Sequence, residues 1–131
     1  MLETGRMLIK IQMARVLCTG WDPGLLATRM LILQSAGHEV HQARTQSEVL
    51  SACEQYQFDV AVIGQTVSPK MKRVVFDLVK EHCPRVKILE LYQPHLGRIV
   101  TDADAWLEVP ADVPRDLAER VSQLANLQGA K

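Results

Sequence analysis

The stretch Phe58-Asp-Val-Ala-Val-Ile-Gly64 decides the fold of this chain. It is apolar at every position except Asp59, and it is too short for a typical buried helix. A short continuous apolar run is typical of a strand in a parallel sheet whose two faces are both covered by helices. Gly64 stands at the carboxyl end of this strand, at the edge of the sheet where parallel α/β proteins place their functional groups. The position therefore has no side chain where a reactive one could be presented.

Strand-like and helix-like segments alternate around this run. The other predicted strands are 15–20, 38–43, 86–92 and 105–109. The predicted helices are 23–37, 45–56, 68–83 and 112–127. Three of the helix starts carry N-cap signals, namely Asp22-Pro23, Thr45 with Glu48, and Ser68-Pro69. In the segment 93–105, Pro94 and Gly97 interrupt the pattern, so any helix there is expected to be short or irregular.

This alternation predicts a doubly wound α/β fold. Right-handed crossovers favour a five-stranded parallel sheet of order 2-1-3-4-5 with helices on both faces. The loops after the first and third strands then form the crevice. Residues 14–131 are expected to form one domain. Residues 1–13 precede the pattern, and they are either an extension before an alternative start at Met13 or a short added helix or strand.

The composition excludes several classes of function. Fifteen basic and fifteen acidic side chains balance, so no global field steers the protein to nucleic acid or an anionic membrane. No apolar run approaches the ~20 residues of a membrane span, and no signal peptide is evident, so we expect a cytoplasmic protein. The three cysteines lack a CxxC pair, and the four histidines lack metal-ligand spacing and are expected at the surface or at caps. We therefore expect neither a metal nor a cofactor.

Four stretches carry a resemblance to a known family: 15–23 (RVLCTGWDP), 34–64, 83–92 (CPRVKILELY) and 103–110 (ADAWLEVP). In this order they resemble the receiver domain of two-component response regulators. The resemblance covers roughly residues 14–127, and it implies a flavodoxin-like fold and a role in bacterial signal transduction.

Receivers transfer a phosphoryl group to an aspartate at the end of the third strand. Two acidic residues after the first strand hold Mg²⁺, a Thr or Ser ends the fourth strand, and a Lys precedes the proline after the fifth. A hard cation requires oxygen ligands, and a transferring phosphoryl group requires nearby positive charge. The matching positions in this chain are Gly64 for the acceptor, Gly20 and Trp21 for the acidic pair, Tyr92 for the hydroxyl and Val109 for the lysine.

The resemblance thus implies a degenerate receiver that cannot be phosphorylated on aspartate. Asp22 is better explained as a helix cap. Asp59 lies at the opposite end of its strand, on the wrong rim of the sheet. The segment between Tyr92 and Val109 is also shorter than in receivers, which puts the fourth helix of the family in question.

We accordingly expect a non-enzymatic module that binds a protein partner or dimerises through the fifth strand and the last helix. Trp21 either fills the vacated site against Tyr92 or is an exposed anchor for a partner. Trp106 is expected to be partly buried at the sheet edge, where receivers commonly dimerise.

Two alternatives remain at this stage. Lys70, Lys72 and Arg73 lie in the first turn of a helix beside the crevice, and they either bind an anionic ligand such as a nucleotide or form a solvated face. Cys18, near a helix N-terminus, is either a reactive thiol for phosphotransfer or redox chemistry or an inert core residue.

Overall fold

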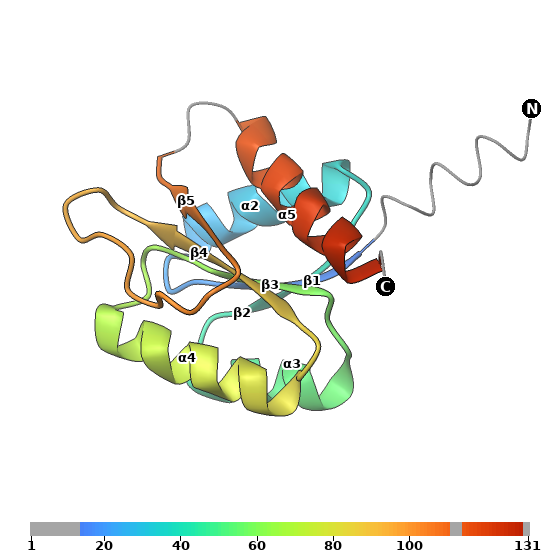
Figure 1. The fold of residues 1–131 in the computed structure, drawn as a ribbon, viewed down its shortest axis with the longest axis horizontal. Coiled ribbons are helices and arrows are strands. Elements are labelled where there is room, and N and C mark those ends of the chain that lie inside the picture. The colour runs from blue at the N-terminus through green and yellow to red at the C-terminus, as the bar shows by residue number, and fades with distance from the viewer. Residues whose placement is uncertain (1–13, 111–113, 130–131) are drawn as a thin grey trace, which may run out of the picture.

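A computed structural model describes residues 14–110 and 114–129, and only the backbone of 127–129 (Figure 1). Five parallel strands form one sheet of order β2-β1-β3-β4-β5. They are β1 Arg15–Thr19, β2 Glu39–Ala43, β3 Val60–Ile63, β4 Lys87–Tyr92 and β5 Ala105–Glu108. The described helices are α2 Pro23–Ser35, α3 Gln46–Gln55, α4 Pro69–His82 and α5 Pro114–Gly129. The predicted fold class and strand order are confirmed.

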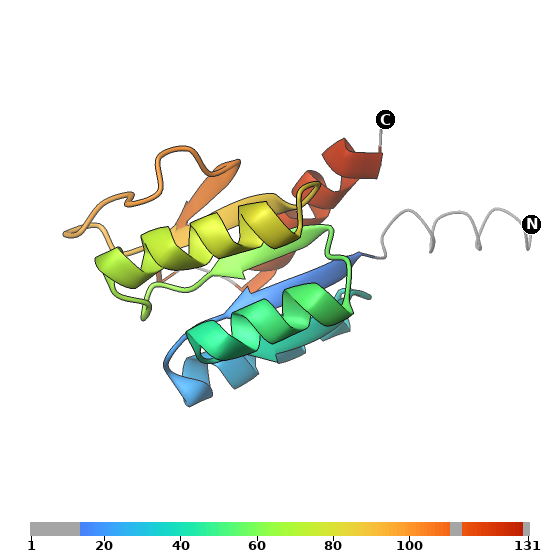
Figure 2. The same cartoon turned by 90° about the horizontal axis from the view of Figure 1, so that it is seen from below.

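The helices cover both faces of the sheet. Helices α2 and α5 lie on one face, and α3 and α4 lie on the other (Figures 1 and 2). Successive side chains of a strand point to opposite faces. Val16 and Cys18 of β1 therefore pack under α2 and α5, whereas Leu17 between them packs under α3 and α4. This double burial explains why the strands are apolar at nearly every position.

The predicted N-caps are confirmed. Asp22 Oδ1 accepts hydrogen bonds from the amides of Gly24 at 2.9 Å and Leu25 at 3.2 Å. Thr45 Oγ1 accepts from Glu48 N at 3.1 Å, and Ser68 Oγ accepts from the amide three residues later at 3.3 Å. The predicted start of the last helix at Asp112 falls outside the described residues, as does the predicted extension 1–13.

The segment between β4 and β5 forms turns, and its described residues include no helix. It is fixed by Glu90, a fully buried residue of β4. The Glu90 carboxylate accepts hydrogen bonds from the amides of Ile99 at 3.0 and 2.9 Å and of Val100 at 3.0 Å. An extended loop is thus held by one buried side chain in place of a packed helix.

Lys72 of α4 completes this arrangement. Its Nζ donates to Glu90 Oε2 and to the carbonyl of Leu91, each at 2.8 Å, and the lysine is only 3% exposed. Lys72 therefore fits neither alternative given for it, since it is not on a solvated face and its charge is paired inside the protein. Burying either charge alone is costly, and the pair is tolerated because each charge meets both its partner and backbone groups. Helix α4, strand β4 and the following segment are joined at this point.

We predict that Glu90→Ala lowers the free energy of unfolding by roughly 3–5 kcal/mol, because it leaves Lys72 buried without its counter-charge. Hydrogen exchange at the amides of Ile99 and Val100 should accelerate at the same time. Urea unfolding and exchange measurements test this. The matched control is Asp77→Ala, which breaks the exposed pair of Asp77 with Arg73 on the same helix and should change stability little. Equal effects of the two substitutions would contradict the assigned role of Glu90.

His38 is buried, which corrects the expectation that the histidines lie at the surface or at caps. Its Nδ1 accepts from Ala14 N at 3.2 Å, and its Nε2 lies 3.2 Å from Ser122 Oγ of α5. Nδ1 must be unprotonated to accept, so this contact requires the neutral ring. Burial lowers the pKa of His38, and the charge of Asp59 offsets part of this effect.

We predict a stability that depends on His38 in mildly acid solution. The unfolded chain binds the proton more readily than the folded one, so the free energy of unfolding is at its full value above the ordinary histidine pKa of about 6.5 and falls as the pH is lowered below it. His38→Gln should flatten this part of the pH profile in urea unfolding. The control His95→Gln changes an exposed residue and should keep the original profile. An unchanged slope in His38→Gln would contradict the prediction.

Candidate functional site

The crevice predicted from the sequence lies where β1 and β3 end. Gly64 N donates to Thr19 O at 3.0 Å, just beyond the ends of the two strands. The Thr19 hydroxyl donates to Val62 O at 2.9 Å and is fully buried. The backbones of the two strand ends are thus held against each other at this edge of the sheet.

Gly64 has no room for a side chain. A Cβ atom at this position would lie 2.7 Å from Thr19 O and 3.3 Å from Arg29 Nη1. The first distance is below what real Cβ atoms show, and the close atom belongs to the backbone. Glycine is required here by the close approach of two strands.

Arg29 of α2 occupies the space above Gly64. Its Nη2 donates to Gln65 Oε1, and the residue is only 8% exposed. Arg29 was not predicted as a site residue from the sequence, although a signal was present. Arg29 is three residues after Leu26 and four before Leu33, so it lies on the buried face of α2, where a cation needs an explanation.

The positions of the acidic pair are closed by Thr66, which the sequence analysis also missed. Thr66 Oγ1 accepts from the amides of Trp21 at 2.9 Å and Asp22 at 3.3 Å. A Cβ at Gly20 would meet Thr66 Oγ1 at 3.6 Å, an ordinary contact, so this glycine is not sterically required. The Asp22 carboxylate caps α2, as expected.

Trp21 and Tyr92 have different recorded contacts. Trp21 is half-buried against the core under α3 and α4, whereas the Tyr92 ring lies beneath the guanidinium of Arg98 at 5.7 Å. The ring pairs of the described residues do not join Trp21 to Tyr92. Arg29 is a side chain that lies over Gly64, and a Trp21 plug against Tyr92 stays a prediction.

Val109 stands at the position of the family's lysine. It is buried, and it lines a cavity between α2, β5 and α5 together with other apolar side chains. The five matched positions therefore offer a glycine without space for a side chain, a second glycine, two aromatic rings turned to other contacts, and a buried valine.

Comparison with known proteins gives a clear result for the fold. No protein-family model matches the chain, and no curated protein matches it. Among solved structures it is similar to a CheY-like response regulator receiver domain protein from Methanospirillum hungatei (TM-score 0.73, 22% identity, covering 90% of this chain and 98% of that one). It is also similar to a receiver domain protein from Clostridium thermocellum (TM-score 0.75, 18% identity, 89% and 98%). NtrX from Brucella abortus matches over 89% of this chain and 27% of its own length, with TM-score 0.75 and 16% identity.

The fold is that of a response regulator receiver domain. The resemblance inferred from the sequence is confirmed at this level.

The three cations beside the crevice of this receiver fold do not converge on one point. Lys70 is exposed and Lys72 is buried on Glu90. Arg73 donates to both Asp102 oxygens, at 3.2 and 3.1 Å, and to Asp77 at 3.1 Å. Two of the three charges are thus paired within the protein.

Cys18 is a core residue of the receiver fold. It is fully buried under α2 and α5, and burial raises the pKa of its thiol to about 12, with the charge of Arg29 acting in the opposite direction. At neutral pH the thiol is protonated and enclosed, which favours the inert alternative.

Trp106 of β5 is half-buried, as expected. Its Nε1 donates to Val100 O at 3.1 Å, and its ring lies 4.5 Å from the guanidinium carbon of Arg98. Its carbonyl accepts from Arg120 of α5. These contacts join β5, α5 and the irregular segment into one continuous edge of the receiver fold.

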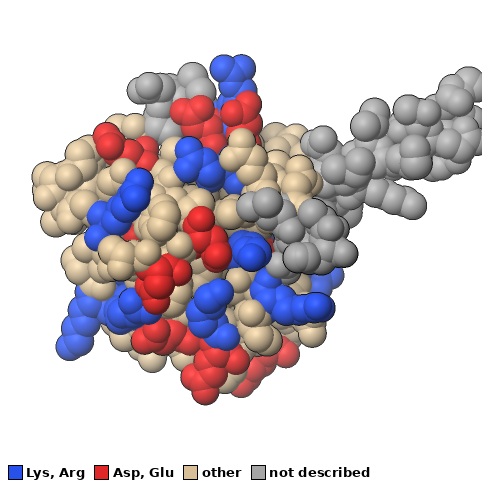
Figure 3. Space-filling view, viewed as in Figure 1, with Lys and Arg blue, Asp and Glu red and all other residues tan. Residues whose placement is uncertain are grey.

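Basic and acidic side chains are interspersed on the face seen in Figure 3. Within residues 14–110 and 114–129, no three His, Cys, Asp or Glu side chains are grouped so as to hold a metal ion. No helix of the described chain is long and apolar enough to cross a membrane.

We predict that Gly64→Ala destabilises the receiver fold by roughly 1–3 kcal/mol, because its methyl group forces β1 and β3 apart. Gly20→Ala is the matched control. It introduces the same methyl group at a position where its contacts are ordinary and should be neutral or slightly stabilising. Urea unfolding of the two variants tests the contrast, and equal stabilities would show that the close contact at Gly64 is relieved without cost.

Proposed function

We propose that this protein is an atypical receiver, or pseudo-receiver, that acts in signal transduction through protein–protein contacts and without aspartyl phosphorylation. The observation that carries the proposal is the packing at Gly64. Thr19 O and Arg29 leave no space there for a carboxylate side chain. The position therefore lacks both the acceptor side chain and the room that such a side chain would need.

The surroundings of Gly64 support the same proposal. Mg²⁺ binds hard oxygen ligands, mostly carboxylates and water. Near the crevice the Asp22 carboxylate is already engaged in capping α2. A fixed guanidinium above Gly64 also repels a divalent cation. The site thus lacks both the group that would accept a phosphoryl and the ligands that would hold the metal.

The output of such a domain comes from its surfaces. We propose that β5 and α5 form the contact with a partner or a second copy, since Trp106, Arg98 and Arg120 are packed into one rigid edge. Aromatic and arginine side chains are enriched in the energetically dominant parts of protein interfaces. We further propose that the protein is non-enzymatic and works in the cytoplasm.

The two alternatives receive less support. A phosphotransfer or redox role for Cys18 requires an accessible thiolate, whereas the thiol is buried with a raised pKa. An anion site at Lys70, Lys72 and Arg73 requires converging free charges, whereas two of these residues form internal ion pairs.

Incubation with acetyl phosphate and Mg²⁺, followed by intact-mass analysis, tests the phosphorylation part of the proposal. We expect no phosphoryl adduct because the chain has no acceptor at the end of β3. A receiver that carries the acceptor aspartate, treated in parallel, is the positive control. A phosphoryl adduct on this chain that hydroxylamine removes, as it does an acyl phosphate, would overturn the proposal.

Affinity capture from the native host tests the interaction part. We expect a specific partner, or a second copy of the chain, to be retained by the original protein and lost with Trp106→Ala. Trp21→Ala changes a half-buried residue that follows β1, which β3 and β4 separate from β5 in the sheet, so it is the matched control and should keep the partner. Retention by both variants, with a monomer in light scattering, would contradict the assigned edge.

A further inference from the structure

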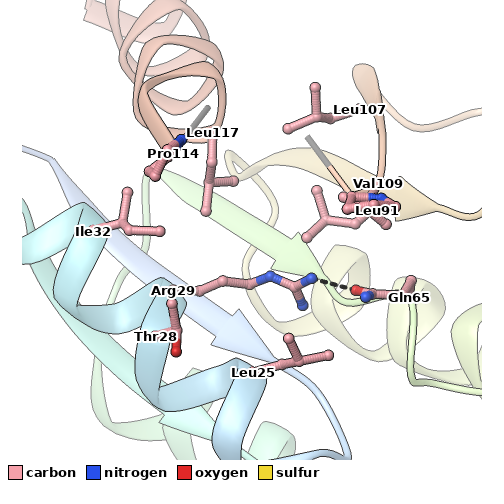
Figure 4. A pocket seen from close by; sticks show the side chains of 11 residues that line it. Leu25, Thr28, Arg29, Ile32, Gln65, Leu91, Leu107, Val109, Pro114 and Leu117 are labelled. Atoms are coloured by element: carbon pink, nitrogen blue, oxygen red, sulfur yellow. Dashed lines mark hydrogen bonds between the residues drawn. The ribbon is translucent and has the colours of Figure 1, made fainter. Parts of the chain in front are cut away.

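A cavity of about 230 Å³ lies between α2, the ends of β4 and β5, and the beginning of α5 (Figure 4). Its walls are mainly aliphatic: Leu25, Ile32, Leu91, Leu107, Val109 and Leu117. It is larger than the roughly 150 Å³ cavity known to hold a benzene molecule, and smaller than the pockets of about 300 Å³ and above that hold drug-sized ligands. Its dimensions suit a ring or a short alkyl chain.

One charged group borders this apolar space. Arg29 extends from α2 past the cavity to Gln65, as Figure 4 shows. A guanidinium has five N–H donors. In the part of the chain that the structure describes, its hydrogen-bond partner is the neutral amide oxygen of Gln65, and no carboxylate lies within 4.0 Å of it.

The charge of Arg29 has no ion-pair partner within 4.0 Å among the described residues. Burial lowers the pKa of Arg29, since the charged form loses water, and charge interactions with Cys18 and with the Asp22 carboxylate offset part of this effect. Buried charges in proteins are normally paired with an opposite charge. Elsewhere in this chain Lys72 follows that rule through Glu90, whereas Arg29 has a neutral partner.

We infer that this cavity is a binding site for a small amphiphilic carboxylate, whose apolar body lies against the aliphatic walls and whose head group pairs with Arg29. A carboxylate matches the guanidinium because the two can form parallel charge-assisted hydrogen bonds. The apolar walls favour a hydrocarbon tail over a polar one. A purely inorganic anion would satisfy Arg29 but would leave the remaining space unfilled.

The site shares Arg29 with the crevice at Gly64, and it extends the proposed function. A bound molecule would contact Leu107 of β5 and Leu117 of α5, the two elements that we assign to the partner interface. The ligand would thereby bias the packing of that edge. The binding experiment below does not depend on the identity of any partner.

Sodium octanoate is the probe, and 1-octanol is the neutral molecule of the same chain length. Titrations followed by ¹H–¹⁵N correlation spectra should show saturable shifts at Leu25, Arg29 and Leu117 with octanoate. Octanol should bind at least about tenfold more weakly, as expected for loss of a charge-assisted contact. Arg29→Met should remove this preference. Lys70→Gln, which removes an exposed cation on α4, is the control and should retain it.

Leu25→Trp provides an independent readout, because it fills the cavity from the partly exposed face of α2 and keeps Arg29. It should abolish binding of both probes, and it remains informative if Arg29→Met does not fold. Equal affinity for octanoate and octanol would overturn the assignment of a carboxylate. Three results would overturn the site itself. They are shifts that persist in Leu25→Trp, a spectrum of the original protein that does not change with octanoate, and inorganic phosphate that produces the same shifts in full.

Discussion

The close approach of Gly64 to the Thr19 carbonyl is the constraint on which the crevice depends. It joins the ends of β1 and β3 so tightly that a single methyl group at Gly64 would lie 2.7 Å from a backbone oxygen. Arg29 lies over this contact and reaches Gln65 in the following loop. In a receiver fold this edge of the sheet is where a carboxylate would meet a metal ion, and here backbone packing and a cation occupy it.

Two buried cations organise the two faces of the sheet in different ways. Under α3 and α4, Lys72 meets Glu90, which also fixes the loop that replaces a helix between β4 and β5. Under α2 and α5, Arg29 meets a neutral amide beside an apolar cavity. In the first arrangement the two opposite charges meet directly, whereas in the second the cation has no carboxylate within 4.0 Å among the described residues. Because of this difference, we assign a structural role to the Lys72–Glu90 pair under α3 and α4, and a ligand-binding role to Arg29 under α2 and α5.

The elements of the fold follow from local patterns, and the site does not. Apolar runs and N-cap residues such as Asp22 and Thr45 act within a few positions of the chain, so they predicted the strands and the starts of α2, α3 and α4, and the handedness of the crossovers then predicted the strand order. Lys72 and Arg29 were misjudged or missed because their partners, Glu90 and Gln65, lie 18 and 36 residues away. A long cation on a helix is compatible with solvent or with burial until its partner is known. The absence of an acceptor at Gly64 could be inferred from the resemblance, but the lack of space there required coordinates.

Beryllofluoride with Mg²⁺ tests the central claim most directly, since it mimics a phosphoryl group without requiring covalent transfer. We expect the ¹H–¹⁵N spectrum of the protein to stay unchanged at beryllofluoride and Mg²⁺ concentrations that saturate a receiver with an intact site. Saturable shifts centred on Gly20, Gly64 and Tyr92 would contradict it, because they would place a metal and a phosphoryl mimic where the structure has only packed backbone and Arg29.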